Sequence, residues 1–327
     1  MDLSIRNKRE EFELKNSDAD SEVLKFDGVG NKTVYNCSVP LIYNDETYIF
    51  GRVEEREIWA NSHSVLFKLG KDGVFRPDYR FLPLGLEDPF WTKIGEEYIF
   101  GGNIVFRSGC GRENAVRTMF FKGKTPFDWY HFALGPKMMK DIRLVELPEG
   151  RIGVFSRPRS DEVEKKYGSK SVIGFTIIGS LCELNPEVIE NAENIEGFFG
   201  KGEWGGVNQA FYLGNDKIGI IGHQCYSNLG IGIEEPCYLC ISCVYDIKSG
   251  KVFDKKILAT RKSFPATEAK VRQMYDCVFT SGITFRKDGK ADLYGGLSDM
   301  FEGRKTIENP FADYMEKEEE NACRLFA

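Results

Sequence analysis

Polar residues recur along this sequence at the starts of short apolar runs. The five that open such runs are Asn36, Asp88, Asp141, Asn208 and Asp276. A second polar set follows five later apolar runs and consists of Arg52 with Glu54, Asn103, Arg157 with Arg159, His223, and Asp299. Together the two sets offer carboxylates, amides and cations, which are side chains that bind polar or anionic substrates and transfer protons to them.

Two kinds of chemistry fit this combination. Arg52 and Arg157 suit bidentate binding of phosphate, and His223 is a third potential cation. Carboxylates suit proton transfer to a departing sugar oxygen, as in glycoside cleavage. Each position taken alone also has a structural interpretation, because Asp and Asn form turns at strand starts and Arg157 could pair with a neighbouring acid. The gathering of the whole set at one place would favour a binding site.

The runs that carry these residues are strand-like and repeat five times. The segment Tyr-Ile-Phe-Gly occurs at residues 48–51 and again at 98–101. Weaker copies occur at residues 152–156, 218–222 and 291–295. Each copy follows one of the polar openers after a turn rich in Gly, Asn, Asp or Pro, which predicts a hairpin. Five such hairpins predict an all-β fold, a five-bladed β-propeller, and a two-sheet sandwich is the alternative.

Hairpin geometry would bring the polar residues together. In an antiparallel hairpin the start of the first strand lies beside the end of the second strand. The five openers and the residues that follow the five repeats therefore share one rim of the predicted propeller. We expect the binding site at this rim, where all blades surround a central depression.

The repeats divide the 327-residue chain into three parts. We expect residues 1–30 to form a peripheral or closing segment, residues 31–309 the propeller with its site, and residues 310–327 a charged tail. Lys and Arg number 44 against 50 Asp and Glu, for a formal charge of −6, which argues against a nucleic-acid partner. The apolar runs are too short to span a membrane and the N-terminus lacks a signal-like apolar core, so we expect a cytoplasmic protein. Nothing in the sequence indicates an oligomeric state.

Nine cysteines in a chain without a signal do not predict a disulfide framework. The spacing Cys237-x-x-Cys240-x-x-Cys243 could suggest a metal site. Alternation along a strand would, however, put the middle thiol on the face opposite to the other two. We therefore expect ordinary buried cysteines and no bound metal.

Three further features carry weaker signals. The glycine-rich residues 200–205 predict a loop, from which Lys201 and Trp204 could contact a ligand. The charged insertion at residues 160–170 predicts either a solvated loop or a mobile lid over the rim. The other two histidines, His63 and His131, are expected to be structural.

Several of these segments resemble the mannoside phosphorylases of glycoside hydrolase family 130. Residues 87–89 (Glu-Asp-Pro) look like that family's motif at the second blade, and Lys140-Asp141 looks like its Lys-Asp at the third. Residues 156–158, 221–223 and 294–299 are similar to its His-Arg-Pro, Tyr-His-Gly and Tyr-Gly-Ala-Ala-Asp segments. The order and blade positions agree over residues 36–300.

A closer resemblance is to glycosyltransferase family 108, the mannosyltransferase–phosphorylases of β-1,2-mannan metabolism. Residues 27–30, 35–40, 51–54 and 59–62 look like the opening blade of that group. This resemblance covers nearly the whole chain. It implies a five-bladed propeller that acts on β-mannosides with inversion.

The resemblance also implies roles for single residues. Asp88 would be the general acid and would act through a sugar hydroxyl that relays the proton to the glycosidic oxygen. The phosphate of substrate or product would be bound by Arg52, Lys140, Arg157 and His223. The mannose hydroxyls would be bound by Asp141, Asn208 and Asp299. Ser156 and Phe90 stand where family 130 has His and Arg, so one phosphate contact of that family is expected to be absent.

The rim adds further substrate-binding candidates, which are Asn36, Glu54, Asn103 and Asp276. The sequence as a whole predicts an inverting β-mannoside phosphorylase or mannosyltransferase that forms or uses α-mannose 1-phosphate or GDP-mannose. Phosphate, a sugar phosphate or a nucleotide sugar would be the co-substrate of a manno-oligosaccharide, and no cofactor is expected. One alternative is an inverting glycosidase in which Asp276, Asp299 or Glu54 activates water. The other is a carbohydrate-binding propeller without catalysis.

Overall fold

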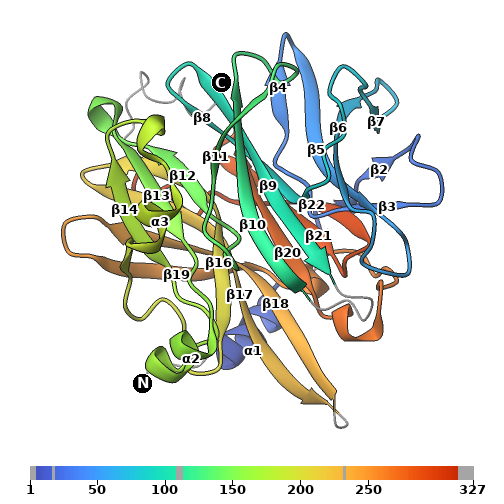
Figure 1. The fold of residues 1–327 in the computed structure, drawn as a ribbon. Coiled ribbons are helices and arrows are strands. Elements are labelled where there is room, and N and C mark those ends of the chain that lie inside the picture. Colours follow the sequence, from blue (N-terminus) through green and yellow to red (C-terminus); the bar gives the residue numbers. More distant parts are fainter. Residues whose placement is uncertain (1–4, 17–18, 108–112, 231–232, 316–327) are drawn as a thin grey trace.

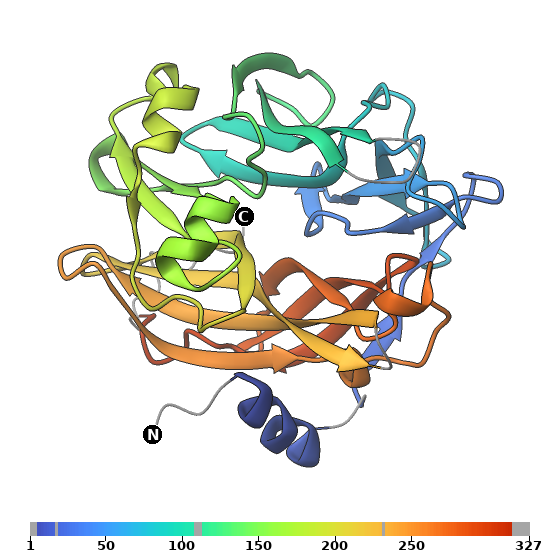
Figure 2. The same cartoon turned by 60° about the horizontal axis from the view of Figure 1, so that its bottom comes forward.

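The computed structural model describes residues 5–16, 19–107, 113–230 and 233–315. Most of these residues lie in β-strands, which form five sheets around a common axis (Figure 1). Figure 2 shows the sheets as a ring that follows the order of the chain. The predicted all-β, five-bladed propeller is therefore confirmed.

Each blade is one sheet, antiparallel except where β2 pairs with β7 in blade one. Blade one consists of β2 (Lys25–Phe26), β3 (Thr33–Tyr35), β4 (Leu41–Tyr43), β5 (Glu46–Glu54), β6 (His63–Leu69) and β7 (Val74–Pro77). Blade two consists of β8 (Glu87–Ile94), β9 (Glu97–Arg107), β10 (Glu113–Gly123) and β11 (Tyr130–Leu134). Blade three consists of β12 (Arg143–Glu146), β13 (Ile152–Ser156), β14 (Gly174–Ile178) and β15 (Glu193–Asn194).

Blade four consists of β16 (Trp204–Gly214), β17 (Lys217–Gly230), β18 (Ile233–Asp246) and β19 (Lys251–Ala259). Blade five consists of β20 (Val278–Phe285), β21 (Lys290–Leu297), β22 (Phe301–Glu308) and the N-terminal strand β1 (Ser21–Val23). The helices are α1 (Ile5–Lys15), α2 (Asp161–Tyr167) and α3 (Pro186–Glu190). Short 3₁₀ turns are η1 (Pro148–Gly150), η2 (Leu181–Glu183), η3 (Arg261–Ser263) and η4 (Arg272–Met274).

The predicted hairpins form the inner part of every blade. They are the pairs β4–β5, β8–β9, β12–β13, β16–β17 and β20–β21. Two of their turns have left-handed backbone at both central residues: φ is 50° at Asn44 and 60° at Asp45, and 50° at Asn215 and 55° at Asp216. Turns of this type match the twist of paired strands, and Asn and Asp tolerate the conformation better than most residues.

Apolar side chains fill the boundaries between successive blades. Phe50 of blade one and Phe100 of blade two are fully buried, and their ring centroids lie 4.5 Å apart. Separate apolar clusters join blades two and three, three and four, and four and five. Among the described residues no such cluster joins blade five to blade one. Buried polar contacts cross that boundary instead, for example from the Cys37 N–H to the Glu302 carboxylate at 2.9 Å.

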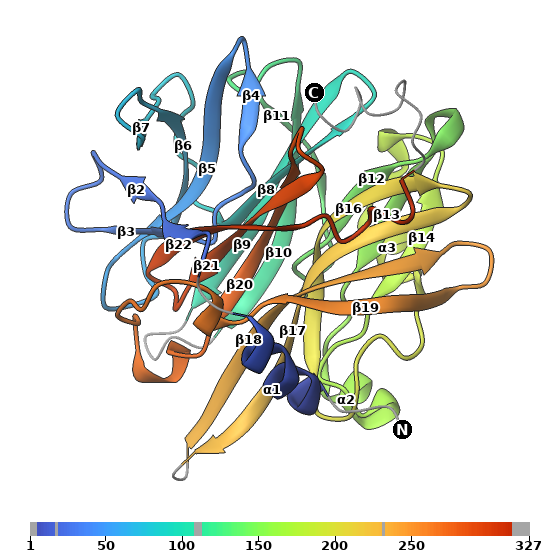
Figure 3. The ribbon, with the colours of Figure 1, turned by 180° about the vertical axis from the view of Figure 1, so that it is seen from behind.

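The N-terminal segment closes the ring. β1 pairs with β22, so the outer strand of blade five comes from the start of the chain. Helix α1 packs outside blade four (Figures 2 and 3), and its Arg9 guanidinium donates to both carboxylate oxygens of Asp276 at 2.7 and 2.9 Å. The described part of the N-terminal segment thus contributes β1 to blade five and β2 to blade one.

Other sequence predictions have equally direct outcomes. Cys237, Cys240 and Cys243 all lie in β18 and are fully buried, as expected of core cysteines. No group of His, Cys, Asp or Glu in the described ranges could hold a metal ion. No helix of the described chain is both long and apolar enough to span a membrane. Phe311, in the first part of the predicted tail, is buried between blades four and five, and residues 316–327 lie outside the described residues.

The contact of Arg9 with Asp276 predicts a measurable stability effect. Replacing Arg9 by Ala would remove two charge-assisted hydrogen bonds from a carboxylate that is only 30% exposed. We expect Arg9→Ala to lower the free energy of unfolding by about 1–3 kcal/mol, below the loss typical of a fully buried pair. Urea denaturation would measure this loss. Glu10→Ala, an exposed position on the same helix, is the control, and superimposable curves for Arg9→Ala and wild type would contradict the prediction.

Candidate active site

A pocket of about 500 Å³ lies at the rim where the inner hairpins begin and end. Most of the residues predicted for the site line it, namely Asn36, Arg52, Asp88, Lys140, Asp141, Arg157, His223 and Asp299. These residues come from all five blades or from the segments that lead into them. The structure therefore gathers on one surface what the hairpin argument placed on one rim.

Four of the lining residues have left-handed backbone. The φ angles are 45° at Asn36, 50° at Asp88, 61° at Asp141 and 56° at Asp299. Residues other than glycine rarely adopt this conformation, and such strain gathers at functional sites because the surrounding structure must hold it. At Asp88 the pairing of β8 with β9 also shifts register. Asp88 thus interrupts the regular backbone of β8, and the other three residues lie just outside the neighbouring strands at the pocket.

The Asp88 carboxylate is held at one oxygen. Asn36 Nδ2 donates to Asp88 Oδ1 at 2.9 Å, and Arg52 Nη1 donates to the same atom at 3.0 Å. The side chain is 7% exposed and lines the pocket. These two hydrogen bonds fix the carboxylate at the wall of the pocket.

Arg52 lies among three carboxylates. Its guanidinium contacts Asp88, Glu54 at 2.8 Å and Glu87 at 3.2 Å, and its carbon Cζ lies 4.9 Å from the centre of the Tyr35 ring. Burial raises the pKa of Glu87, and the charge of Asp88 adds to this, while Arg52 opposes it. Burial also acts against the charged form of Glu54, but Arg52 and Lys270 hold the pKa of Glu54 below its ordinary value.

A second ionic group forms the opposite part of the pocket. Arg157 Nη1 donates to Asp141 Oδ2 at 2.7 Å, and both side chains are almost fully buried. Burial alone would raise the pKa of Asp141, but the Arg157 charge, with Arg143 and Lys140 nearby, lowers it to about 2. Asp141 is therefore a carboxylate at neutral pH.

His223 differs from its prediction as a cation. Its Nδ1 lies 2.7 Å from Asn208 Oδ1, and its Nε2 lies 4.0 Å from Asp141 Oδ2. Full burial, together with the charges of Arg157, Arg143 and Lys140, lowers the pKa of His223 to about 3, although Asp141 opposes this. The imidazole is thus neutral at pH 7. With Nδ1–H donating to Asn208, Nε2 becomes a hydrogen-bond acceptor.

Two glycines make room for these side chains. A Cβ atom at Gly296 would lie 1.9 Å from Asn36 Oδ1. A Cβ atom at Gly206 would lie 2.8 Å from His223 Cε1 and 3.2 Å from Asp141 Oδ2. Both glycines are therefore needed for the close approach of strands β21 and β16 to the site.

Several lining residues were not assigned to the site from the sequence. They are Trp59, Glu87, Arg107, Lys170, Tyr238, Met274, Cys277 and Phe279. Arg159, which the rim argument had included, and Lys170 of the charged insertion flank helix α2 and add two cations to the pocket. Of the two candidates in the glycine-rich loop, Trp204 lines the pocket and Lys201 does not. Lys170 Nζ lies 4.7 Å from the centre of the Trp204 ring. The sequence signals for these cations were the position of Arg159 two residues after Arg157 and the charged insertion that ends at Lys170.

Four predicted residues are not in the lining. Glu54 lies behind Arg52 and is fully buried, and Asn208 lies behind His223. Asn103 is buried against Thr118, whose hydroxyl donates to its Oδ1 at 2.9 Å. Asp276 precedes β20, which begins at Val278, and its carboxylate binds Arg9 of helix α1 outside the pocket lining. Glu54 and Asn208 still support the pocket through Arg52 and His223.

Comparisons with known proteins agree with the propeller fold. No curated protein matches the chain. MPT-4, a mannose phosphorylase from Leishmania mexicana solved with a phosphate ion, matches with a TM-score of 0.87 and 40% identity over 95% of each chain. MPT-1, a GDP-Man-dependent mannosyltransferase from the same organism, matches with a TM-score of 0.85 and 39% identity over 96% of this chain and 97% of that one. A β-1,2-mannobiose phosphorylase from Listeria innocua, 15% identical over 89% of this chain and 91% of that one, shares the fold with a TM-score of 0.57.

The fold and the pocket define a five-bladed propeller enzyme of the glycosyltransferase and phosphorylase class. The chain belongs to the family described as a protein of unknown function (DUF1861), whose model matches residues 10–313, and shares its fold with the two Leishmania enzymes. The resemblance to the mannosyltransferase–phosphorylases of glycosyltransferase family 108 is thereby confirmed. With the Listeria innocua phosphorylase the chain shares the fold.

The neutral state of His223 predicts a pH dependence of stability. The pKa of His223 is about 3 in the folded protein and about 6.5 in the unfolded chain, so the unfolded chain binds more protons between these values. Stability should therefore fall as the pH falls below about 6.5. We expect wild type to lose about 2 kcal/mol more than His223→Gln between pH 7 and pH 5. Urea denaturation at both pH values would measure this, and equal losses in the two proteins would contradict it.

Proposed function

We propose that the protein is an inverting mannoside phosphorylase or mannosyltransferase that acts on β-1,2-linked manno-oligosaccharides. The reaction exchanges mannose between the oligosaccharide and phosphate, or the phosphate group of a sugar donor. The observation that carries the proposal is the pocket that joins the Asp88 carboxylate to a row of cations, in a chain about 40% identical to a mannose phosphorylase and to a GDP-Man-dependent mannosyltransferase.

In the proposed reaction Asp88 is the general acid. A phosphate oxygen attacks the anomeric carbon from the face opposite to the glycosidic bond, and that bond breaks with inversion to give α-mannose 1-phosphate. Asp88 gives its proton to a sugar hydroxyl, which passes a proton to the departing oxygen. In the synthetic direction the Asp88 carboxylate receives the proton back by the same path. Because Arg52 and Asn36 both act on Oδ1, Oδ2 is the atom that exchanges the proton.

The cationic edge is suited to the phosphate. Arg157, Lys140, Arg159 and Lys170 line the pocket, and cations there would offset the repulsion between an incoming anion and the site's carboxylates. His223 adds no charge to this group. As a neutral acceptor at Nε2 it would instead bind a hydroxyl of the sugar or of a protonated phosphate.

The geometry disfavours the hydrolase alternative. An inverting glycosidase needs a second carboxylate that activates water. Glu54 is enclosed by Arg52, Lys270 and Tyr35, and Asp276 lies outside the pocket. Asp299 does line the pocket, but its Oδ2 already accepts a hydrogen bond from Trp59 Nε1 at 2.9 Å. A phosphate nucleophile removes the need for such a base.

The test of the proposal is the product formed from β-1,2-mannobiose with and without inorganic phosphate. We expect mannose 1-phosphate only when phosphate is present, or transfer from mannose 1-phosphate or GDP-mannose to an acceptor. Asp88→Asn should lower kcat by about 10²–10⁴-fold, because general acid catalysis contributes an effect of that size.

Asp276→Asn makes the same chemical change at a carboxylate outside the pocket, and its turnover should stay near that of wild type. Full activity of Asp88→Asn would refute its role as the acid. Phosphate-independent release of free mannose would instead support the glycosidase.

The assignment of Arg157 to phosphate predicts a second kinetic effect. Arg157→Lys keeps the positive charge but loses the planar guanidinium, whose Nη1 holds Asp141 Oδ2 and whose remaining N–H groups would bind phosphate. We expect the KM for phosphate to rise about tenfold or more, with a smaller effect on the KM for the mannoside. Initial rates over a range of phosphate concentrations would show this. An unchanged KM for phosphate would place the phosphate elsewhere in the pocket.

A further inference from the structure

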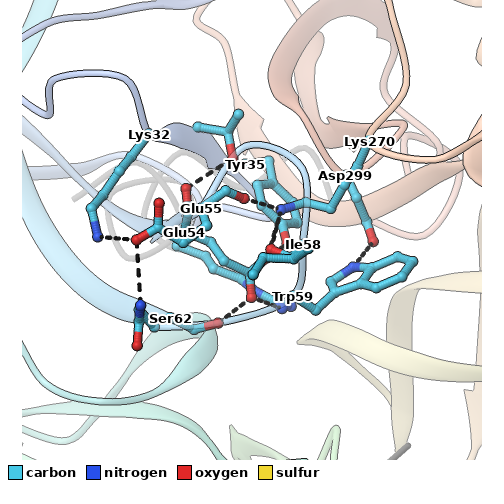
Figure 4. A network of polar contacts seen from close by, with 12 residues as sticks. Lys32, Tyr35, Glu54, Glu55, Ile58, Trp59, Ser62, Lys270 and Asp299 are labelled. Carbon is cyan, nitrogen blue, oxygen red and sulfur yellow. Dashed lines mark hydrogen bonds and ion pairs between the residues drawn. The ribbon is translucent and has the colours of Figure 1, made fainter. Parts of the chain in front are cut away.

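A fully buried ammonium group links blade five to blade one. Lys270 lies in the segment between η3 and η4, and its side chain is 0% exposed. Its Nζ donates to Glu54 Oε2 at 2.9 Å, to the Glu55 carbonyl at 2.5 Å and to the Ile58 carbonyl at 3.2 Å (Figure 4). All three donors of the ammonium are therefore used on blade one.

One of these contacts leads to Asp88. Glu54 Oε1 accepts from Arg52 Nη2 at 2.8 Å, and Arg52 Nη1 donates to Asp88 Oδ1 at 3.0 Å. Tyr35 also donates its hydroxyl hydrogen to Glu54 Oε2. Lys270 thus supports the ion pair that fixes the general acid.

The other two contacts lead to Trp59. Glu55 and Ile58 belong to the loop between β5 and β6, and Trp59 follows directly after Ile58. The Trp59 indole N–H donates to Asp299 Oδ2 at 2.9 Å, and both side chains line the pocket (Figure 4). Lys270 therefore sets the position of the backbone that carries Trp59.

The energetics show how much this bridge depends on its partners. An ammonium removed from water is costly unless every proton is bound and an opposite charge is near. Burial lowers the pKa of Lys270, and the charge of Glu54 opposes that effect. In the described part of the chain no apolar cluster joins blades five and one, and this polar bridge is one of the contacts that join them, beside the one from Cys37 to Glu302.

We propose that Lys270 is a positioning residue that places Trp59 against Asp299, so that the two form a binding subsite for one mannosyl unit. An indole ring offers an apolar surface to the C–H face of a sugar, and the Asp299 carboxylate accepts from its hydroxyls. The inference deepens the proposed function and rests on it for the identity of the sugar.

A matched control lies in the same two loops. Arg56 of the β5–β6 loop pairs with Glu268 near Lys270, but both side chains are exposed, at 45% and 56%. Arg56→Gln removes an ion pair between the same segments without touching the buried ammonium. Lys270→Met removes the ammonium and keeps a chain of similar length.

The first experiment does not depend on activity. The chain has four tryptophans, so labelling with 5-fluorotryptophan gives four ¹⁹F signals, of which Trp59→Phe identifies the one from Trp59. We expect Lys270→Met to shift or broaden the Trp59 signal and Arg56→Gln to leave it in place. An unchanged Trp59 signal in a folded Lys270→Met protein would overturn the positioning role.

The second experiment measures the KM for β-1,2-mannobiose in a double-mutant cycle. We expect Lys270→Met and Trp59→Phe each to raise this KM about tenfold, and the double variant to raise it little further, because both changes act on the same subsite. If the double variant instead raises the KM by the product of the two single effects, the shared subsite is overturned. If Lys270→Met does not fold, Lys270→Arg, which keeps the charge but changes the three contacts, is judged by the same two criteria.

The two experiments also separate this inference from the proposed function. If wild type turns over no mannoside while Lys270→Met shifts the Trp59 signal, the proposed function is refuted and the positioning by Lys270 is supported. If wild type turns over the mannoside and the Trp59 signal is unchanged in Lys270→Met, the positioning role is refuted and the proposed function is supported.

Discussion

The burial of Arg52 among carboxylates is the constraint on which the pocket depends. Glu54, Glu87 and Asp88 all contact its guanidinium. Lys270 also pairs with Glu54, and Arg107 pairs with Glu87. Three negative and three positive groups thus balance in a volume almost without solvent. Because an unpaired charge there would be costly, the positions of these side chains are interdependent. Asp88 is therefore fixed before any ligand arrives, which is the preorganisation that a proton-transferring group requires.

The rest of the pocket is richer in cations. Asp141 and Arg157 form a closed pair, His223 is neutral, and the remaining cations Lys140, Arg159 and Lys170 come from segments that lead into or follow the strands of blade three. The pocket thus combines a side from blades one, two and five, where paired charges nearly cancel, with a side from blade three and its insertion that is rich in cations. A substrate that combines a neutral sugar with an anionic group fits such a division better than a purely neutral one does.

The sequence predicted the parts of the structure that depend on local patterns. Phe50 and Phe100 stand at equal places in the two Tyr-Ile-Phe-Gly segments, and their packing follows from the strand alternation that the repeat shows. The rim argument placed Asn36, Asp88 and Asp141 together because each begins an inner strand. Trp59 appeared in the sequence only as part of a resemblance, since a loop residue carries no periodicity.

Contacts between segments that are far apart in the chain could not be predicted from such local patterns. Asp276 begins an apolar run as the other openers do, but Arg9 of the N-terminal helix binds it, and nothing near either residue indicates this pairing. Lys270 lies in an irregular segment, and its role depends on a loop of blade one, which is distant in the chain but adjacent in the ring. The charge of His223 depends on complete burial, which composition and spacing do not report.

The pairing of β1 with β22 has a consequence for how the chain reaches its fold. β1 leaves the ribosome among the first segments, while its partner is among the last strands to be made. Blade five therefore stays incomplete until synthesis is almost finished, and contacts of such large sequence separation slow folding. During that interval β1 lacks its partner strand, and its unpaired edge is open to pairing with other strands.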